Sequence, residues 1–172
     1  MIAYRDAIPA DAAPLADLHR RSFVETFGHL YRAEDLETFL LGLSEQGYRS
    51  ELLDGEHQIR FAEAGGRPVA FVKLGPVTLP VEPARPALEV RQLYVLAPWQ
   101  GTGIARELAD WAIAQARARG AEELYLSVWT GNRRARAFYR RYGFAYVAPY
   151  KFMVGGQADE DEIWRLDLKE RQ

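Results

Sequence analysis

Residues 98–110, PWQGTGIARELAD, place two glycines just before a run whose apolar residues recur at helical spacing. The first backbone N–H groups of a helix have no partner inside the helix, and the helix dipole makes that end partly positive. Glycine permits positive φ and lets an anion approach the backbone closely. Such a turn is either a plain connection between a strand and a helix or a cradle for a phosphate group. The spacing of the glycines leaves both alternatives open.

The two better-known phosphate-binding patterns do not fit this turn, but a third does. G-x-x-x-x-G-K-[ST] is absent, and G-x-G-x-x-G fails because residue 106 is arginine. Residues 100–105, QGTGIA, resemble the [QR]-x-x-G-x-[GA] signature of the GNAT N-acetyltransferases. Residues 132–144, NRRARAFYRRYGF, resemble the N-x-x-A-x-x-F-Y-x-x-x-G-F block of the same family. The two blocks together are specific, and the motif-level resemblance extends over residues 88–144.

The resemblance implies that acetyl-CoA is the co-substrate and that backbone amides of the glycine turn bind its pyrophosphate. The chain has no cysteine to carry the acetyl group, so we expect direct attack of an amine on the thioester in a ternary complex. No motif indicates a covalent serine or threonine intermediate. The acetyl-CoA contacts that the resemblance implies are Leu93, Tyr94, Val95, Gln100, Gly101, Thr102, Gly103, Ile104, Ala105, Asn132, Ala135, Phe138 and Tyr139.

Transfer of an acetyl group to an amine needs a base, donors for an oxyanion and an acid. An alkylamine has a pKa of about 10.4, so a base must remove its proton directly or through water. The resemblance places Tyr139 beside the sulfur as the acid that protonates the departing thiolate; the alternative is a core aromatic beside Phe138. It also implies that the strand carrying Leu93 and Val95 splays from its parallel neighbour and exposes amides to the acetyl carbonyl. Asn132 is expected to cap the following helix, a role that leaves it free to contact pantetheine.

Glu89 is the preferred base. Strand alternation sets Glu89 on one face with Arg91, Leu93 and Val95, opposite Leu88, Val90, Gln92 and Tyr94. Burial on that apolar face would raise the pKa of Glu89 toward neutrality, and its position matches a glutamate that some family members use as base. The alternatives are an exposed carboxylate paired with Arg91, and deprotonation through water or backbone carbonyls, as in many relatives.

Two charge clusters bear on the substrates. Five arginines at 133, 134, 136, 140 and 141 form either a solvated basic face or a contact with the 3′-phosphate of CoA. The run D159-E-D-E162 is expected to be a solvated hairpin turn, with attraction of a cationic amine as the alternative. The stretches LSVWTGN, ETFGHLY and KFMVGG, the last followed by Asp161 and Ile163, resemble a bacterial branch that includes polyamine N-acetyltransferases.

The pattern of elements predicts one α/β (α+β) domain over residues 1–172. The expected sheet is mixed and mostly antiparallel, with about six or seven strands, one parallel splayed pair and about four flanking helices. Gly65-Gly66 predicts a hairpin turn, and four prolines make residues 76–86 an extended loop. The expected helices cover 11–25, 33–46, 104–119 and 133–142, and the strands cover 2–7, 58–64, 68–75, 87–96, 123–129, 144–154 and 162–168.

Composition limits the class of protein. The net charge of −2 argues against a general nucleic-acid binder, and three scattered histidines without cysteine argue against a metal site. With no apolar run of membrane-spanning length and no secretory signal, we expect a cytoplasmic protein. The sequence therefore predicts an acetyl-CoA-dependent N-acetyltransferase acting on a polyamine or another small amine. Acetylation of protein N-termini or lysines, and a non-catalytic acyl-CoA sensor, are the alternatives, and a homodimer is left open.

Overall fold

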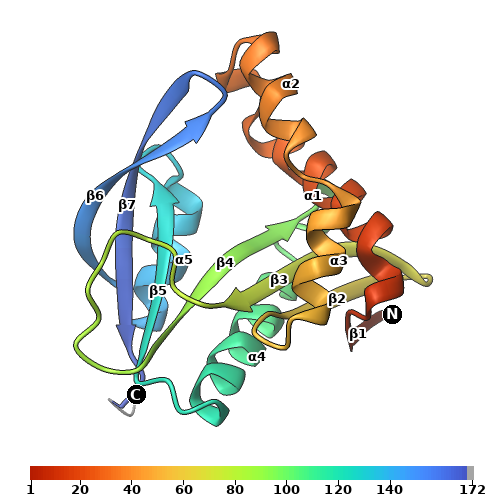
Figure 1. The fold of residues 1–172 in the computed structure, drawn as a ribbon. Helices are drawn as coiled ribbons and strands as arrows, with labels where there is room; N and C mark the ends of the chain where they lie inside the picture. Colours follow the sequence, from red (N-terminus) through yellow and green to blue (C-terminus); the bar gives the residue numbers. More distant parts are fainter. Residues whose placement is uncertain (170–172) are drawn as a thin grey trace.

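The structure is a computed structural model that describes residues 1–169, and this part of the chain forms a seven-stranded sheet in the order β1-β2-β3-β4-β5-β7-β6 (Figure 1). Every neighbouring pair is antiparallel except β4 and β5. The mixed, mostly antiparallel sheet with one parallel pair is therefore confirmed. The strands are β1 (Ile2–Asp6), β2 (Gln58–Ala64), β3 (Arg67–Gly75), β4 (Ala87–Val95), β5 (Glu123–Trp129), β6 (Ala145–Val154) and β7 (Gln157–Asp167).

Helices cover both faces of the sheet. Phe71 of β3 packs against His19 of α1, whereas Arg60 of β2 lies over Trp111 of α4 on the opposite face. On the other half of the sheet, α5 packs on the same face as α4, against a core that includes Leu126 and Trp164. The α-helices are α1 (Ala12–Phe27), α2 (Ala33–Leu41), α3 (Glu45–Leu53), α4 (Ile104–Ala118) and α5 (Arg133–Tyr142).

The helix expected over residues 33–46 is divided into two. Helix α2 ends at Leu41, and Ser44 starts α3 as its N-cap by accepting a hydrogen bond from the backbone N–H of Gly47 at 3.0 Å. A serine at this position favours a new helix start over continuation, because its side chain satisfies an otherwise unpaired N–H group. The second helix then packs against α1.

The acidic run at 159–162 is also placed differently from the expectation. It lies inside β7, and the hairpin turn falls at Gly155-Gly156, where Gly155 has a φ of 57°. Glycine adopts this left-handed conformation without strain, so the pair of glycines sets the turn. The acidic side chains therefore alternate between the two faces of a strand.

The loop of residues 76–86 covers part of the face that α5 leaves free. Its residues Val77, Leu79 and Val81 pack against Tyr125 of β5 and Ile163 of β7. This face is opposite to α5, because alternate residues of β5 and β7, such as Leu126 and Trp164, point toward that helix. Beyond the loop, toward the β6–β7 turn, the same face is left to the site described next.

Candidate active site

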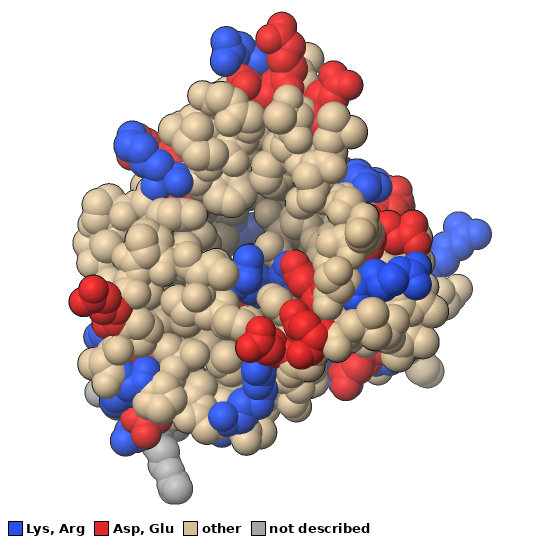
Figure 2. Space-filling model, viewed as in Figure 1, with Lys and Arg blue, Asp and Glu red and all other residues tan. Residues whose placement is uncertain are grey.

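The parallel strands β4 and β5 pair only at their beginnings. Residues 87–89 pair with residues 123–125, and no further pairs follow between these two strands. A cleft of about 950 Å³ occupies the space where they separate, and the space-filling view shows the surface hollowed at its centre (Figure 2). Residues of α1, β4, α4, β5, α5 and β7 all line it. The cleft therefore connects the two faces of the sheet.

Backbone groups of β4 face this opening. The N–H of Leu96 donates to Val69 of β3 at 2.9 Å, so by the alternation of an antiparallel ladder Tyr94 also bonds toward β3. Leu93 and Val95 then direct their N–H and C=O groups to the side from which β5 has withdrawn. In agreement, the Val95 carbonyl accepts a hydrogen bond from the side chain of Gln100 at 3.1 Å. Leu93, Tyr94 and Val95 all line the cleft.

The glycine turn lies at the mouth of the cleft. Gly101 and Gly103 have φ values of 77° and 91°, and Gly103 immediately precedes α4. Non-glycine residues rarely adopt such values, so the glycines are needed for this path of the backbone. Four of the predicted residues of the turn line the cleft: Gln100, Gly101, Gly103 and Ala105. The side chain of Ile104 is buried in the core instead, and the Thr102 hydroxyl donates to the Trp99 carbonyl at 2.5 Å.

Helix α5 presents Tyr139 to the same cleft, together with Ala135 and Phe138. Tyr139 contacts the rings of Phe138 and Phe144, at centroid distances of 5.3 and 5.6 Å. Burial raises the pKa of Tyr139 above its usual value, so its phenol stays protonated at neutral pH. Asn132 lines the cleft and caps α5 as expected, because its Oδ1 accepts the backbone N–H of Ala135 at 3.1 Å.

Glu89 is buried but lies outside the lining of the cleft. Its Oε1 accepts the backbone N–H groups of Thr78 and Leu79 at 2.9 and 3.2 Å, and its Oε2 lies 3.2 Å from Arg91 Nε. The carboxylate thus holds the loop of residues 76–86. Its role as a base stays a prediction.

The predicted alternation along β4 is wrong because of a bulge at Arg91. Lys73 pairs with Gln92, and the next residue, Leu74, pairs with Val90, so Arg91 is the extra residue. Paired residues share a face. Glu89 therefore lies on the face of Gln92 rather than on that of Leu93.

Three of the five arginines of α5 have two different kinds of surroundings. Arg136 donates to the Thr130 carbonyl and pairs with Glu162 at 2.9 Å, so it stabilises the helix against the sheet. Arg134 and Arg141 line the cleft, and Arg134 also donates to Gln100 Oε1 at 3.1 Å. A basic lining at this mouth favours an anionic ligand.

The opposite end of the cleft is aromatic and acidic. Asp159 and Asp161 line it with Tyr31, whose hydroxyl donates to Asp159. Asp161 is only 8% exposed, and its Oδ1 has no hydrogen-bond partner. The sequence contained the signal for this pair, because D-x-D-x-I at 159–163 has the period of a strand. The remaining lining here is mostly aromatic and includes Phe23, Phe27, Phe39, Trp129 and Phe152.

Contacts between α2 and the β6–β7 turn close this end of the cleft. The backbone N–H of Gly156 donates to Asp35 Oδ1 at 2.7 Å, and Phe39 packs against Phe152 at 5.7 Å between ring centroids. In Figure 1 the tip of the β6–β7 hairpin correspondingly reaches α2.

Within residues 1–169, no helix is long and apolar enough to cross a membrane, and no group of three or more His, Cys, Asp or Glu side chains is arranged to hold a metal ion.

Comparisons with known proteins agree with this geometry. The sequence model of the acetyltransferase (GNAT) family matches residues 13–144. An uncharacterized N-acetyltransferase of Mycobacterium bovis is 28% identical over 92% of this chain and 98% of its own length. The aminoalkylphosphonate N-acetyltransferase of Salmonella typhimurium is 34% identical over 57% of this chain and 63% of its own. The PaiA N-acetyltransferase of Thermoplasma acidophilum, solved with coenzyme A, shares the fold, with a TM-score of 0.80, 20% identity and coverage of 97% and 99% of the two chains.

Proposed function

The chain belongs to the GNAT family of acetyltransferases and is an acetyl-CoA-dependent N-acetyltransferase of that type, and we propose that its acceptor is a polyamine or another small primary amine. The main support for placing the active site in this cleft is a single observation. The opening between β4 and β5 is bordered by the glycine turn before α4, by the free backbone edge at Leu93 and Val95, and by Tyr139. These are the elements that binding and cleavage of a thioester require.

The glycine turn and the basic lining are suited to acetyl-CoA. The N-terminal N–H groups of α4 and the positive-φ glycines offer donors to a pyrophosphate, and Arg134 and Arg141 supply positive charge for a further phosphate. The pantetheine arm would then follow the open edge of β4.

The reaction on this geometry is direct aminolysis. The amine nitrogen forms a bond to the thioester carbon, and the oxyanion is stabilised by backbone N–H groups of the open β4 edge. Collapse of the tetrahedral intermediate breaks the carbon–sulfur bond, and Tyr139 gives its proton to the thiolate. The phenol recovers a proton from the nitrogen, which leaves a neutral amide and CoA.

The far end of the cleft supports a small cationic acceptor. Two carboxylates line it, and the contacts of Asp35 and Phe39 with the β6–β7 hairpin bridge it. An acidic, bridged chamber suits an ammonium on a slender chain better than a polypeptide lying across an open groove. Acetylation of proteins is therefore the second choice. A sensor without activity has no use for a phenol held in its neutral form.

The test is release of free thiol from acetyl-CoA in the presence of spermidine, an arylalkylamine or a peptide with a free N-terminus. Tyr139→Phe should lower kcat by about 100-fold or more, as loss of a general acid does, and lower the affinity for acetyl-CoA much less. The control is Tyr146→Phe, because Tyr146 is exposed on β6. Equal rates for Tyr139→Phe and the parent would remove the acid role. Binding of acetyl-CoA with no acceptor-dependent thiol release would remove the enzyme assignment itself.

A further inference from the structure

Asp161 is a buried carboxyl group without a partner. It is 8% exposed, its Oδ1 makes no hydrogen bond, and it forms no ion pair within the described residues. Burial, then the charges of Asp159 and Glu160, raise the pKa of Asp161 to about 7. Burying an unpaired carboxylate is unfavourable unless something else compensates. The position therefore calls for a ligand that supplies positive charge.

The groups around Asp161 do not supply that charge. On β7 the neighbours are Asp159 and Glu160, and Glu160 is engaged with Lys151 of β6 at 2.6 Å. The remaining neighbours come from other elements. Tyr31 follows α1, Tyr94 lies on β4, and Trp129 of β5 and Tyr150 of β6 are the strand partners of Asp161. Tyr31 and Tyr94 are neutral at pH 7, because burial raises the pKa of each above its usual value.

Asp161 and Tyr139 approach the cleft from opposite faces of the sheet. Tyr139 comes from α5, toward which Glu162 and Trp164 point. Asp161 alternates with those residues, so it points away from α5. Tyr94 lines the same cleft as both residues, and burial, then Tyr139 and Asp161, raise the pKa of its phenol. A ligand in the gap between β4 and β5 can therefore meet Tyr139 on one side and Asp161 on the other.

We propose that Asp161 binds the ammonium group of the acceptor and takes the proton that the amine loses before it attacks acetyl-CoA. This inference rests on the proposed function. Of the two protons that an ammonium loses on becoming an amide N–H, one goes to Asp161 Oδ1 and then to solvent. The other replaces the proton that Tyr139 gives to the thiolate. The nitrogen–carbon bond forms, the carbon–sulfur bond breaks, and both protons are accounted for.

The aromatic lining next to Asp161 narrows the class of acceptor. The rings of Phe27 and Trp129 meet edge to face at 6.3 Å between centroids, and Tyr31 stacks on Phe23 at 5.8 Å. These rings border the chamber on the side of α1. Ring faces attract a cation, and they bury an alkyl or aryl stem. The acceptor is therefore a primary ammonium carried on an apolar stem that is short enough for a bridged chamber.

The experiment compares Asp161→Asn with Glu160→Gln, which removes one negative charge from the adjacent residue on the other face of β7. For each protein, kcat and KM for the amine are measured as a function of pH, together with acetyl-CoA affinity and thermal unfolding. In Asp161→Asn, kcat/KM for the amine should fall by about 100-fold or more, and the limb of the pH profile near pH 7 should disappear. Affinity for acetyl-CoA should be unchanged. Glu160→Gln should keep the rate and the limb, with the limb moved to lower pH because Glu160 no longer raises the pKa of Asp161.

An acceptor amine of low pKa, such as 2,2,2-trifluoroethylamine, tests whether Asp161 accepts a proton or only supports the structure. This amine is largely neutral at the assay pH, so it should lose much less activity than spermidine in Asp161→Asn. A lowered melting temperature with equal losses for both amines would show that Asp161 only supports the fold, and would overturn the inference. An unchanged rate and pH limb in Asp161→Asn, with an active parent, would also overturn it. An inactive parent that binds acetyl-CoA would instead refute the proposed function.

Discussion

Asp161 and His19 are buried titratable side chains on the same cleft, and they act on stability in opposite directions. The pKa of Asp161 is raised from 3.8 to about 7, so between these pH values the native state keeps a proton that the unfolded chain has lost. The free energy of unfolding therefore falls as the pH rises through that window. Burial, then Lys73, lowers the pKa of His19 from 6.5 to about 3, so its contribution rises with pH over that range.

The Asp161→Asn variant isolates the first of these effects. Asparagine carries no charge, so the variant should be as stable as the parent near pH 4 and more stable at pH 8, with the difference developing between the two. Urea unfolding at several pH values measures it. His19 is present in both proteins and cancels, and Glu160→Gln serves as the charge-matched control. A variant less stable than the parent at pH 8 would contradict the prediction.

At the scale of elements, Glu89 is the link between β4 and the loop of residues 76–86. Replacement by alanine removes the acceptor for two loop N–H groups and leaves Arg91 without its partner. Loss of such a buried, hydrogen-bonded carboxylate should lower the free energy of unfolding by about 3 kcal/mol. Denaturant unfolding measures this loss, with Glu82→Ala in the exposed part of the same loop as control. If Glu89 were the base, Glu89→Gln would also change the pH–rate profile, which anchoring of the loop does not predict.

Several boundaries of helices and strands that are set by the local sequence were predicted correctly. Gly65-Gly66, the glycine turn before residue 104 and Asn132 all set a boundary through their own backbone or side chain, and the structure confirms each boundary. The face of Glu89 could not be predicted in this way. It depends on the bulge at Arg91, which arises in the pairing of β4 with β3 and not from the alternation within β4 itself.

The acidic end of the cleft could not be predicted from the local sequence either. A run of four acidic residues resembles a solvated turn by composition, yet strand pairing carries it into the sheet and buries Asp161. The bridge between Asp35 and Gly156 joins residues 121 positions apart. The closing of the cleft by this contact therefore depends on tertiary packing alone. The co-substrate side was therefore easier to predict than the acceptor side.

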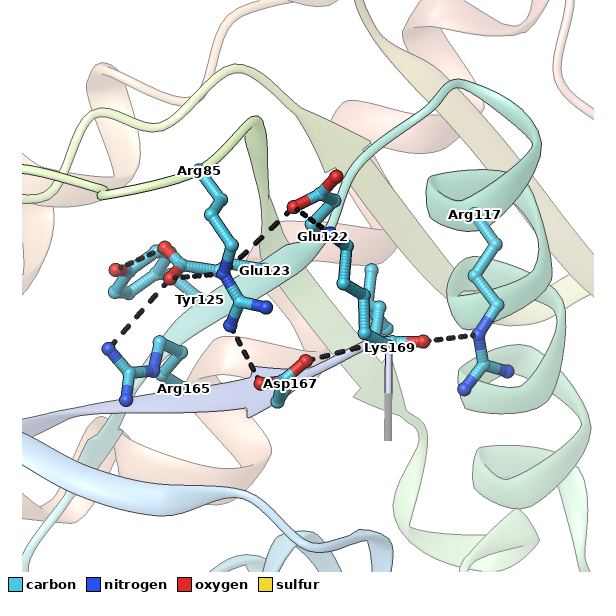
Figure 3. A network of polar contacts seen from close by, with 9 residues as sticks. Arg85, Arg117, Glu122, Glu123, Tyr125, Arg165, Asp167 and Lys169 are labelled. Carbon is cyan, nitrogen blue, oxygen red and sulfur yellow. Dashed lines mark hydrogen bonds and ion pairs between the residues drawn. The ribbon is translucent and has the colours of Figure 1, made fainter. Parts of the chain in front are cut away.

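At the scale of the whole molecule, two halves of the sheet meet where β4 and β5 pair, and a cluster of charged side chains closes that end. Arg85 belongs to the loop of residues 76–86, and its side chain extends toward the beginning of β5 and the end of β7, as Figure 3 shows. It donates to Asp167 Oδ2 at 2.7 Å and to Glu123 Oε1 at 3.4 Å. Glu123 is 1% exposed, so this cluster holds a buried carboxylate where β4 and β5 pair.

Arg85→Ala should therefore weaken the junction without touching the acetyl-CoA site. Glu123 keeps the Tyr125 hydroxyl at 2.9 Å and Arg165 at 3.9 Å, so the expected loss of unfolding free energy is smaller than the full cost of an isolated buried charge. Arg165→Ala, which removes only the more distant cation, should lose less. Thermal and urea unfolding measure both, and an Arg85→Ala variant as stable as the parent would contradict the role of the cluster.

Unfolding of Arg85→Ala and of the parent in the presence of acetyl-CoA completes this test. A ligand that binds only the native state adds about 2.7 kcal/mol at one hundred times its Kd. Arg85 lies outside the cleft lining, so the variant and the parent should gain equal increments at equal saturation, and the deficit of the variant should persist. A larger loss, with weakened acetyl-CoA binding, would mean that the junction also sets the separation of β4 and β5. The cleft would then be a property of the joined halves rather than of the residues that line it.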